Sequence, residues 1–393
     1  MEKLLILGAG IYQVPLIQTA QRMGLEALVV TPDGPYPGIP LADQWYNADT
    51  RDQECILKIA QAEGISGICT SGTDVAMKSI GYVCDNLGLS GVSYQAACRA
   101  TDKMLMKQAF HDSHVATSAF KVVRSEEEAR NAAFELGLPV MLKITDSSGS
   151  RGICKVCRLE EISEAYRSVT AATSLDYVLV EKFVEGYEVG VDGFIGPDGM
   201  PAVVLPHGKF MYKAPNTTVP AGHYFPLDES PLVLETLACE VAKAAKALGL
   251  CNCAFNSDVF VCENGVSIIE MGARTGATCI PELMSIHKGY DWYEKTIRAA
   301  LGQSVSFESD VQVPCMAKLL VSAEDMVIGG IDEAALDALR EKATIQLDVK
   351  AGDAVHAMRN GTDRFGHVIM QTESEAELDD VINRVKNCIT TAW

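Results

Sequence analysis

The sequence has 393 residues, which at roughly 150 residues per domain is enough for two or three domains. Hydrophobic residues make up 48% and charged residues 22% of the chain, so it can bury a substantial core. This composition excludes a disordered protein, a collagen and a disulfide-stapled miniprotein. The formal net charge is −19, which repels phosphate backbones and anionic bilayers, so we expect neither nucleic acid nor membrane as a partner.

The start of the chain and the cysteines indicate the compartment. The first apolar run is interrupted by Gly8, Gly10 and Pro15, so we interpret it as a buried strand and not as a signal peptide. No stretch approaches the roughly 20 apolar residues of a membrane span. The 13 cysteines are odd in number and scattered, which suits a reducing compartment. We therefore expect a cytoplasmic protein.

Strand-like and helix-like stretches alternate over the first hundred residues. Strands separated by helices predict a parallel sheet with crossover connections, and so an open α/β domain. Gly8-Ala9-Gly10 follows the first strand as in a dinucleotide-binding turn, but Gln13 stands where the third glycine belongs. We interpret this segment as a tight turn without a nicotinamide cofactor. The strands are expected at 4–7, 27–30 and 65–70, and helices up to residue 23 and at 52–63.

Beyond residue 100 the expected elements mix strands and helices, beginning with a helix capped by Thr101 or Asp102. Turn residues at 196–199 and 263–265 predict two hairpins. A polar loop containing Lys209, Lys213 and His223 is expected before a long Ala-rich helix. The strands are expected at 120–123, 140–144, 153–156, 177–183, 189–195, 200–205, 254–261 and 266–270, and the helices at 126–136, 159–172, 231–248 and 373–388.

Two closely spaced cysteine pairs could suggest a metal or redox site. Cys154 and Cys157 lie on an expected strand, which sends their side chains to different faces, whereas a zinc site needs converging sulfurs. The second pair is Cys251 and Cys253. We interpret all four as ordinary thiols.

A lysine and a small-residue loop form the first candidate site. Lys143 ends an apolar strand, and the loop 146–152 follows at once. Gly and Ser let backbone N–H groups approach phosphate oxygens, and lysine adds a positive charge. The loop does not match the P-loop pattern. Glu181 ends a later hydrophobic strand, where it could accept a hydrogen bond from a nucleotide.

A pair of carboxylates forms the second candidate site. Asp258 and Glu270 lie almost equidistant from the hairpin turn at Asn264-Gly265, so they are expected to face each other about 5 Å apart. Two acids at that separation repel unless a divalent cation lies between them, and their oxygens suit Mg²⁺ shared with phosphates. Arg274 follows on the same segment and could neutralise a phosphoryl group or a tetrahedral intermediate. The alternative is that these are surface residues facing solvent.

In order and spacing these motifs resemble the ATP-grasp superfamily over roughly residues 1–370. Within it, residues 220–226 resemble the L-amino-acid-ligase branch, and residues 362–368 resemble both that branch and the biotin-carboxylase-like one. The resemblance implies an open parallel α/β domain over 1–98, an ATP-grasp domain over 99–305 with a small lobe at about 119–183, and a C-terminal α+β segment over 306–393. The matching stretches are 101–103, 139–143, 146–152, 180–183, 258 and 268–274.

The resemblance also implies a role for each matching position. The phosphates of ATP would be bound by Lys103 and Lys143, and Mg²⁺, or alternatively Mn²⁺, by Asp258 and Glu270. Arg274 would bind the acyl phosphate or the substrate carboxylate. The adenine and ribose would be held by Glu181, Lys182, the backbone of Phe183 and Val184, and Glu188, under a closing loop formed by Ser147, Ser148, Gly149 and Ser150.

One departure from the family pattern concerns the metal. The usual Glu-x-Asn-x-Arg reads Glu270-Met271-Gly272-Ala273-Arg274, so the metal-binding amide is absent. Water or another side chain must replace it, which puts the second Mg²⁺ in doubt. The loop 146–152 also has Ser where several relatives have a run of glycines.

The implied activity is an ADP-forming carboxylate–amine ligase that makes an amide through an acyl phosphate, acting on amino acids or other small acids. Two alternatives stay open, a carboxylase component that activates bicarbonate and a non-catalytic nucleotide-binding protein. The sequence names neither the acid nor the amine, and it does not give the oligomeric state, although dimers are common in the family. Candidate substrate contacts are Thr73, Asp74, Lys213 and His223.

Overall fold

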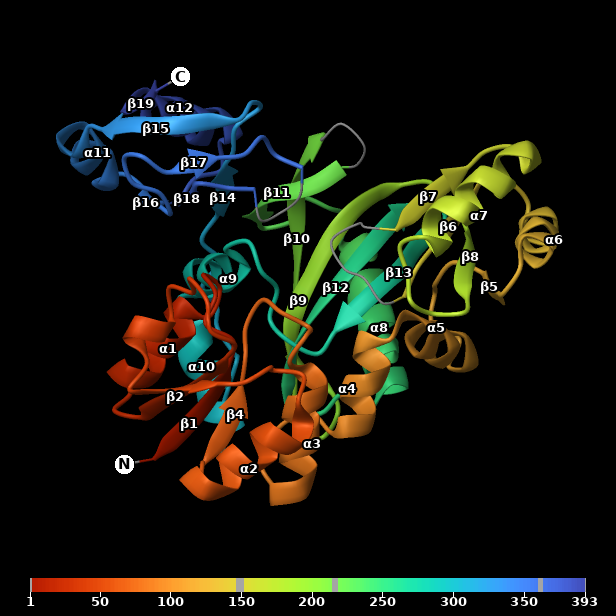
Figure 1. The fold of residues 1–393 in the computed structure, drawn as a ribbon, viewed down its shortest axis with the longest axis horizontal. Helices are drawn as coiled ribbons and strands as arrows, with labels where there is room; N and C mark the ends of the chain where they lie inside the picture. The colour runs from red at the N-terminus through yellow and green to blue at the C-terminus, as the bar shows by residue number, and fades with distance from the viewer. Residues whose placement is uncertain (1, 146–151, 214–217, 360–362, 393) are drawn as a thin grey trace. The chain divides into compact units, whose positions relative to one another are not determined.

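The computed structural model describes residues 2–145, 152–213, 218–359 and 363–392 (Figure 1). The chain forms two compact units, each described by itself below. The first contains Met1–Leu205, Glu229–Ala277 and Tyr293–Glu308, and the second contains Pro206–Asp228, Thr278–Trp292 and Ser309–Trp393. The mixed α/β class expected from the sequence is confirmed, while the three-part division into domains stays a prediction. No described helix combines the length and the apolar character of a membrane span.

The N-terminal sheet is parallel, as the alternation of strands and helices predicts. Its strand order is β3-β2-β1-β4, and Leu4, Leu5 and Ile6 of the central strand are fully buried. Gln13 occupies the turn after β1, where its side chain accepts a hydrogen bond from the Gly10 N–H at 2.8 Å. The elements are β1 (Lys3–Leu7), α1 (Val14–Arg22), β2 (Glu26–Thr31), η1 (Ile39–Leu41), β3 (Gln44–Asn47), α2 (Gln53–Glu63), β4 (Gly67–Cys69) and α3 (Met77–Leu87).

Two helices connect this sheet to the rest of the first unit. They are α4 (Tyr94–Thr101) and α5 (Lys103–Asp112). The Asp102 carboxylate caps α5 by accepting hydrogen bonds from the N–H groups of Met104 and Leu105. Of the two caps that the sequence allows, Asp102 is therefore the one used, and Lys103 becomes the first residue of the helix.

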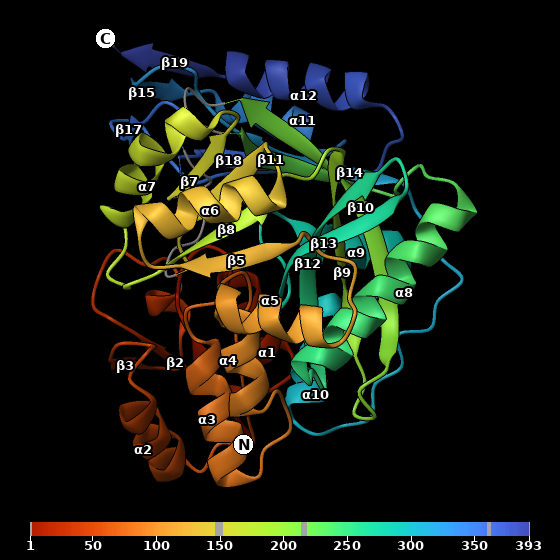
Figure 2. The same ribbon diagram turned by 90° about the vertical axis from the view of Figure 1, so that its right-hand side faces the viewer.

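A small lobe follows with a sheet and a core of its own. The antiparallel strand order is β5-β8-β6-β7, and two helices lie against the sheet, visible together in Figure 2. Its core is aliphatic and includes Val140, Leu142 and Val180. The elements are β5 (Phe120–Val123), α6 (Glu126–Leu136), β6 (Val140–Lys143), β7 (Ile153–Val156), η2 (Leu159–Glu161), α7 (Ile162–Thr170) and β8 (Val178–Lys182).

A larger antiparallel sheet completes the first unit. Its strands run in the order β13-β12-β9-β10, and α8 packs against three of them. The second hairpin and the long helix predicted from the sequence are both present. The elements are β9 (Tyr187–Ile195), α8 (Pro231–Leu248), β12 (Cys253–Cys262), β13 (Gly265–Gly272) and α10 (Trp292–Ala300), with β10 (Pro201–Lys213) beginning in this unit and ending in the second.

The second unit contains the strands β11, β14, β18 and β16 in that order and a three-stranded sheet in the order β17-β15-β19. Its core includes Leu320, Leu336 and Val385. The elements are β11 (Thr218–Phe225), α9 (Ile280–Lys288), β14 (Cys315–Leu320), β15 (Met326–Ile331), α11 (Glu333–Arg340), β16 (Thr344–Leu347), β17 (Ala354–Val355), β18 (Gly366–Met370), α12 (Glu375–Asn387) and β19 (Ile389–Ala392).

The polar loop expected around residues 209–223 is wrong where the structure describes it. Lys209 and Lys213 lie in β10, and His223 lies in β11 directly opposite Lys209. The histidines misled the sequence pattern because they pack here as aromatic rings. His207 and His223 are buried, with ring centroids 4.9 Å apart in an edge-to-face contact.

Candidate active site

One face of the large sheet carries a row of polar side chains. Asp258 and Glu270 are direct partners across β12 and β13, as expected, with a register shift between Asp258 and Val259. Two residues earlier on β12, Asn256 lies opposite Asp192 of β9 on one side and Gly272 of β13 on the other. Directly opposed residues in antiparallel strands point to the same face, and so do residues two apart. The intervening residues, including Phe255, Val259 and Met271, are fully buried.

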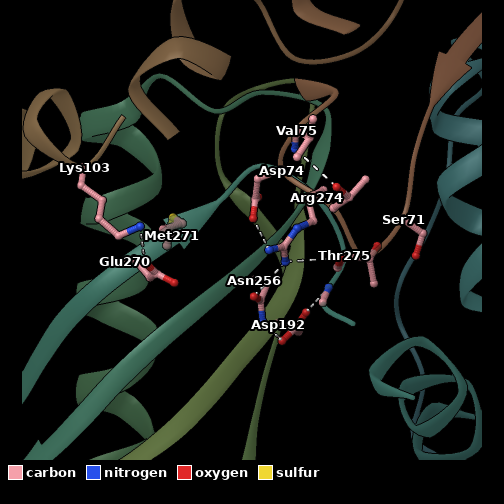
Figure 3. A network of polar contacts seen from close by, with 12 residues as sticks. Ser71, Asp74, Val75, Lys103, Asp192, Asn256, Glu270, Met271, Arg274 and Thr275 are labelled. Carbon is pink, nitrogen blue, oxygen red and sulfur yellow. Dashed lines mark hydrogen bonds and ion pairs between the residues drawn. The ribbon is translucent and has the colours of Figure 1, made fainter. Parts of the chain in front are cut away.

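A lysine from α5 approaches this row. The Lys103 Nζ lies 3.4 Å from Glu270 Oε2 (Figure 3). The Lys103 side chain is 25% exposed and that of Glu270 is 42% exposed. Both groups can therefore exchange this partner for a ligand at modest cost, because ion pairs near solvent are weak.

Arg274 is bound from two sides (Figure 3). Its Nη2 donates to Asp74 Oδ2 at 2.5 Å, and its Nη1 donates to Asn256 Oδ1 at 2.9 Å. Asn256 in turn donates to Asp192 Oδ2 at 2.7 Å. Burial of the guanidinium acts to lower the pKa of Arg274, but the neighbouring carboxylates, Asp74 above all, raise it beyond its usual value. The arginine is a fixed cation at the edge of the polar row.

The glycine that replaces the family's amide makes room for this ion pair. A Cβ atom at Gly272 would lie 2.7 Å from Asp74 Oδ1, closer than van der Waals contact allows. The residue opposite Gly272 is Asn256 on the neighbouring strand, and its amide is bonded at both ends, to Arg274 and to Asp192. The absence of a side chain at Gly272 therefore leaves space for the Asp74 carboxylate from the loop after β4.

The small lobe holds a second cluster around one buried carboxylate. Glu181 Oε2 lies 3.1 Å from Lys143 Nζ and 3.2 Å from Lys107 Nζ, and it accepts a hydrogen bond from Ser118 Oγ at 2.8 Å. Lys107 also donates to the Thr117 hydroxyl at 2.7 Å. Burial acts to raise the pKa of Glu181, yet the two lysines lower it to about 2. Burial lowers the pKa of Lys107.

Sequence reasoning missed Lys107. It lies on the buried face of α5 with Met106 and Phe110, and its side chain is only 3% exposed. The signal was its position four residues after Lys103 and three before Phe110, which places it on the helix face that Phe110 buries. A lysine on an apolar helix face needs a buried carboxylate partner, and the sequence alone does not say that this is Glu181.

The segment expected to hold the adenine is tied into the small lobe. Lys182 Nζ donates to the carbonyl oxygens of Gly137 and Leu138 at 2.8 and 3.2 Å. The Phe183 N–H donates to the Pro139 carbonyl at 3.1 Å. These contacts fix the end of β8, and the adenine role of Glu181, Lys182, Phe183 and Val184 stays a prediction.

The structure gives the positions of several remaining candidate residues, and their roles stay predictions. Glu188 is half-buried near the start of β9, opposite Phe260. Thr73 Oγ1 accepts a hydrogen bond from the Val75 N–H at 3.4 Å, which shapes the loop that carries Asp74. Lys213 and His223 belong to the second unit. Ser147, Ser148, Gly149 and Ser150 lie outside the described residues. All 13 cysteines are free thiols.

Comparison with known proteins identifies the fold family. Residues 136–282 match the family described as the ATP-grasp domain. A crystal structure described as phosphoribosylglycinamide synthetase from Anaerococcus prevotii is 30% identical, with a TM-score of 0.84 over 100% of this chain and 99% of that chain. The chain belongs to the ATP-grasp family.

Two further similar proteins are described as ligases. The L-amino acid ligase from Bacillus licheniformis has a TM-score of 0.81 over 100% of this chain and 99% of that one, at 15% identity, which shows a shared fold. Alanine–anticapsin ligase from Bacillus subtilis is 26% identical over 264 residues, which are 61% of this chain and 55% of that protein. The chain thus spans little more than half the length of that ligase. The predicted enzyme class, an ATP-dependent ligase forming C–N bonds, is confirmed at the level of the family.

The side chains of the first unit fit a nucleotide with a divalent cation. Lys103 and Lys143 carry positive charges that suit phosphates, and Asp258 and Glu270 are paired carboxylates that suit a cation. Among the described residues no three His, Cys, Asp or Glu side chains form a ready metal site. A pair of carboxylates is enough for Mg²⁺, which commonly takes one or two carboxylates and completes its shell with phosphate oxygens and water.

Proposed function

We propose that this protein is an ATP- and Mg²⁺-dependent carboxylate–amine ligase that acts on amino acids or other small carboxylic acids. The observation that carries the proposal is the row on the large sheet, where paired carboxylates, a lysine and a fixed arginine share one face. The carboxylates suit a cation bound to a triphosphate, and the lysine and the arginine suit the phosphates and the substrate acid that must react with them. The family resemblance to amino-acid ligases supports the same substrate class.

Each side chain then has a task in the reaction. Lys143 and Lys103 would bind the phosphates of ATP, while Asp258 and Glu270 would hold Mg²⁺. The metal ion would offset the charge repulsion between the carboxylate and the γ-phosphate. Arg274 would bind the acid and the acyl phosphate formed from it, because a guanidinium matches planar and tetrahedral oxyanions alike.

Amide formation becomes possible because phosphate replaces hydroxide as the leaving group on the acid. The substrate carboxylate attacks the γ-phosphorus of ATP, so an O–P bond forms and ADP leaves. The amine nitrogen then attacks the acyl carbonyl, the C–O bond to phosphate breaks, and the amine loses a proton. Phosphate leaves readily where hydroxide would not, and exclusion of water protects the acyl phosphate meanwhile. We propose Glu188 as a ribose contact, while residues 146–151 of the segment expected to cover the site lie outside the described residues.

The test is a substrate screen. The protein is incubated with ATP, Mg²⁺ and pools of amino acids, and phosphate release is measured alongside mass spectrometry for a condensed product. We expect phosphate release and a product that has lost one water relative to its two substrates. Phosphate release that depends on bicarbonate would instead support a carboxylase component, and nucleotide binding without turnover on any pool would support a regulator.

A matched pair of variants tests the metal role. Glu270→Gln removes one of the two facing carboxylate charges and should lower turnover by about 100-fold or more, since aligned metal ligands contribute several kcal/mol. Glu263→Gln makes the same change at the exposed turn of the same hairpin and should leave turnover unchanged. Equal turnover in both variants would remove the metal assignment.

A further inference from the structure

A buried carboxylate, Asp192, is linked to Arg274 through Asn256. Asp192 is 0% exposed in the middle of β9. Its Oδ1 accepts a hydrogen bond from the Gly276 N–H at 2.9 Å, and its Oδ2 accepts one from Asn256 Nδ2 at 2.7 Å. Asn256 Oδ1 faces the other way and accepts from Arg274 Nη1 at 2.9 Å. The three side chains form one continuous relay across two strands and the segment after β13 (Figure 3).

The order of groups in the relay determines which residue types can form it. A carboxylate only accepts and a guanidinium only donates, so the group between them must do both, and an amide does. An aspartate at position 256 would place two carboxylates in contact, whereas an asparagine at 192 would turn an N–H toward another N–H. The observed sequence is the one in which each donor meets an acceptor.

One of the three nitrogens of Arg274 forms no hydrogen bond among the described residues. Nη1 is bound to Asn256 and Nη2 is bound to Asp74, while Nε is buried and has no hydrogen-bond partner among the described residues. An unsatisfied buried donor on a charged group is costly. Nε is therefore the donor that an arriving oxyanion can satisfy, and its direction depends on how the other two nitrogens are held.

We propose that Asp192 and Asn256 are positioning residues that fix the Arg274 guanidinium so that its Nε–H meets the reacting oxyanion. The identity of that oxyanion rests on the proposed function. The orientation of the arginine rests only on the hydrogen bonds described above. Neither Asp192 nor Asn256 needs to contact substrate or nucleotide, so the relay should affect turnover and leave the ATP requirement alone.

The two ends of the relay can be exchanged, which gives a sharp test. Asp192→Asn and Asn256→Asp each break one hydrogen bond, while the double variant keeps every donor opposite an acceptor and leaves the net charge unchanged. We expect each single variant to lower amino-acid-dependent phosphate release by about tenfold, the equivalent of one lost charge-assisted hydrogen bond. The apparent KM for ATP should stay within about twofold. The double variant should recover most of the turnover.

Combining Asp192→Asn with Arg274→Met distinguishes a positioning role of Asp192 from a merely structural one. In Arg274→Met, adding Asp192→Asn should lower turnover no further, because the group that the relay positions is gone. A further loss of turnover in that background would overturn the proposal. Asn252→Asp is the matched control, since Asn252 lies just before β12 and donates to Ser90 and to the Ala299 carbonyl. It should affect stability and not turnover.

A spectroscopic measurement decides the matter if no amino-acid-dependent turnover is found. The Nε–H signal of Arg274, assigned by its loss in Arg274→Lys, is followed in ¹⁵N-arginine-labelled protein. We expect this signal to shift and its hydrogen exchange to quicken in both single variants, and to return in the double variant. That outcome with no turnover would overturn the ligase assignment and keep the relay. Normal turnover with an unmoved signal in both single variants would overturn the relay and keep the ligase.

Discussion

Asp74 and Arg274 form an ion pair of 2.5 Å although 200 positions separate them in the chain. The pair joins the loop after β4 of the N-terminal sheet to the segment after β13. The arginine side chain is 14% exposed and that of the aspartate 37%. The loop after β4 thus contributes a charged group beside the large sheet and is part of the candidate site.

The fit between Asp74 and Gly272 gives the first prediction. Gly272→Ala places a Cβ atom 2.7 Å from Asp74 Oδ1, so the carboxylate must move away from Arg274. We expect a loss of about 1–3 kcal/mol in the free energy of unfolding, the usual cost of overpacking. The measurement is urea denaturation. In an Asp74→Ala background the same substitution should cost much less, and equal costs in both backgrounds would contradict the proposed crowding.

The second prediction concerns Lys107, whose ammonium group is buried beside the Glu181 carboxylate. Lys107→Met keeps most of the side-chain volume but leaves Glu181 with Lys143 as its remaining cation. Loss of one partner from a buried ion pair costs about 3–5 kcal/mol, and we expect a loss of unfolding free energy near the lower end because Lys143 remains. Lys121→Met is the control. Lys121 pairs with Glu135 at the surface of the same lobe, where a change of about 0.5 kcal/mol is expected.

The same carboxylate predicts how stability depends on pH. The two lysines lower the pKa of Glu181 to about 2, against 4.5 in the unfolded chain. The ionised form is therefore favoured by folding, so its contribution is fully present above pH 4.5 and is lost as the pH falls toward 2. We expect the difference in unfolding free energy between wild type and Glu181→Gln to shrink steadily from about pH 5 to about pH 2. A difference that stays constant over this range would show that the carboxylate is not held in its ionised form.

Local patterns predicted the elements that lie within one stretch of chain. The helix α8 has the predicted bounds, Pro231–Leu248, because proline and a serine cap start it and a glycine ends it. The facing of Asp258 and Glu270 was expected from their nearly equal distance to one tight turn, and a register shift between Asp258 and Val259 brings the two residues opposite each other. Both cases depend on contacts between residues close in sequence, and such contacts are readable from spacing.

Features that depend on tertiary packing were not readable in this way. The pairing of Asp74 with Arg274 requires the loop after β4 to lie beside the segment after β13, and the pairing of Lys107 with Glu181 requires α5 to lie against β8. The end of β10 and the strand β11 were taken for a loop because lysines and the buried His223 look polar in a pattern. In each case the chemistry of the residue was visible, while its partner was fixed only by the fold.

The last prediction concerns Lys143, which has a partner of its own before any nucleotide arrives. Its Nζ lies 3.1 Å from Glu181 Oε2 and its side chain is 13% exposed, so phosphate oxygens must compete with a buried carboxylate for it. Lys107 stays beside Glu181 and can balance its charge when Lys143 turns to the phosphates. Lys143→Met should therefore raise the apparent KM for ATP by about tenfold or more, the worth of one charge-assisted contact. Nucleotide binding is measured by calorimetry with ADP and Mg²⁺, with Lys121→Met as the control. Unchanged ADP affinity and KM in Lys143→Met would remove this lysine from the nucleotide site.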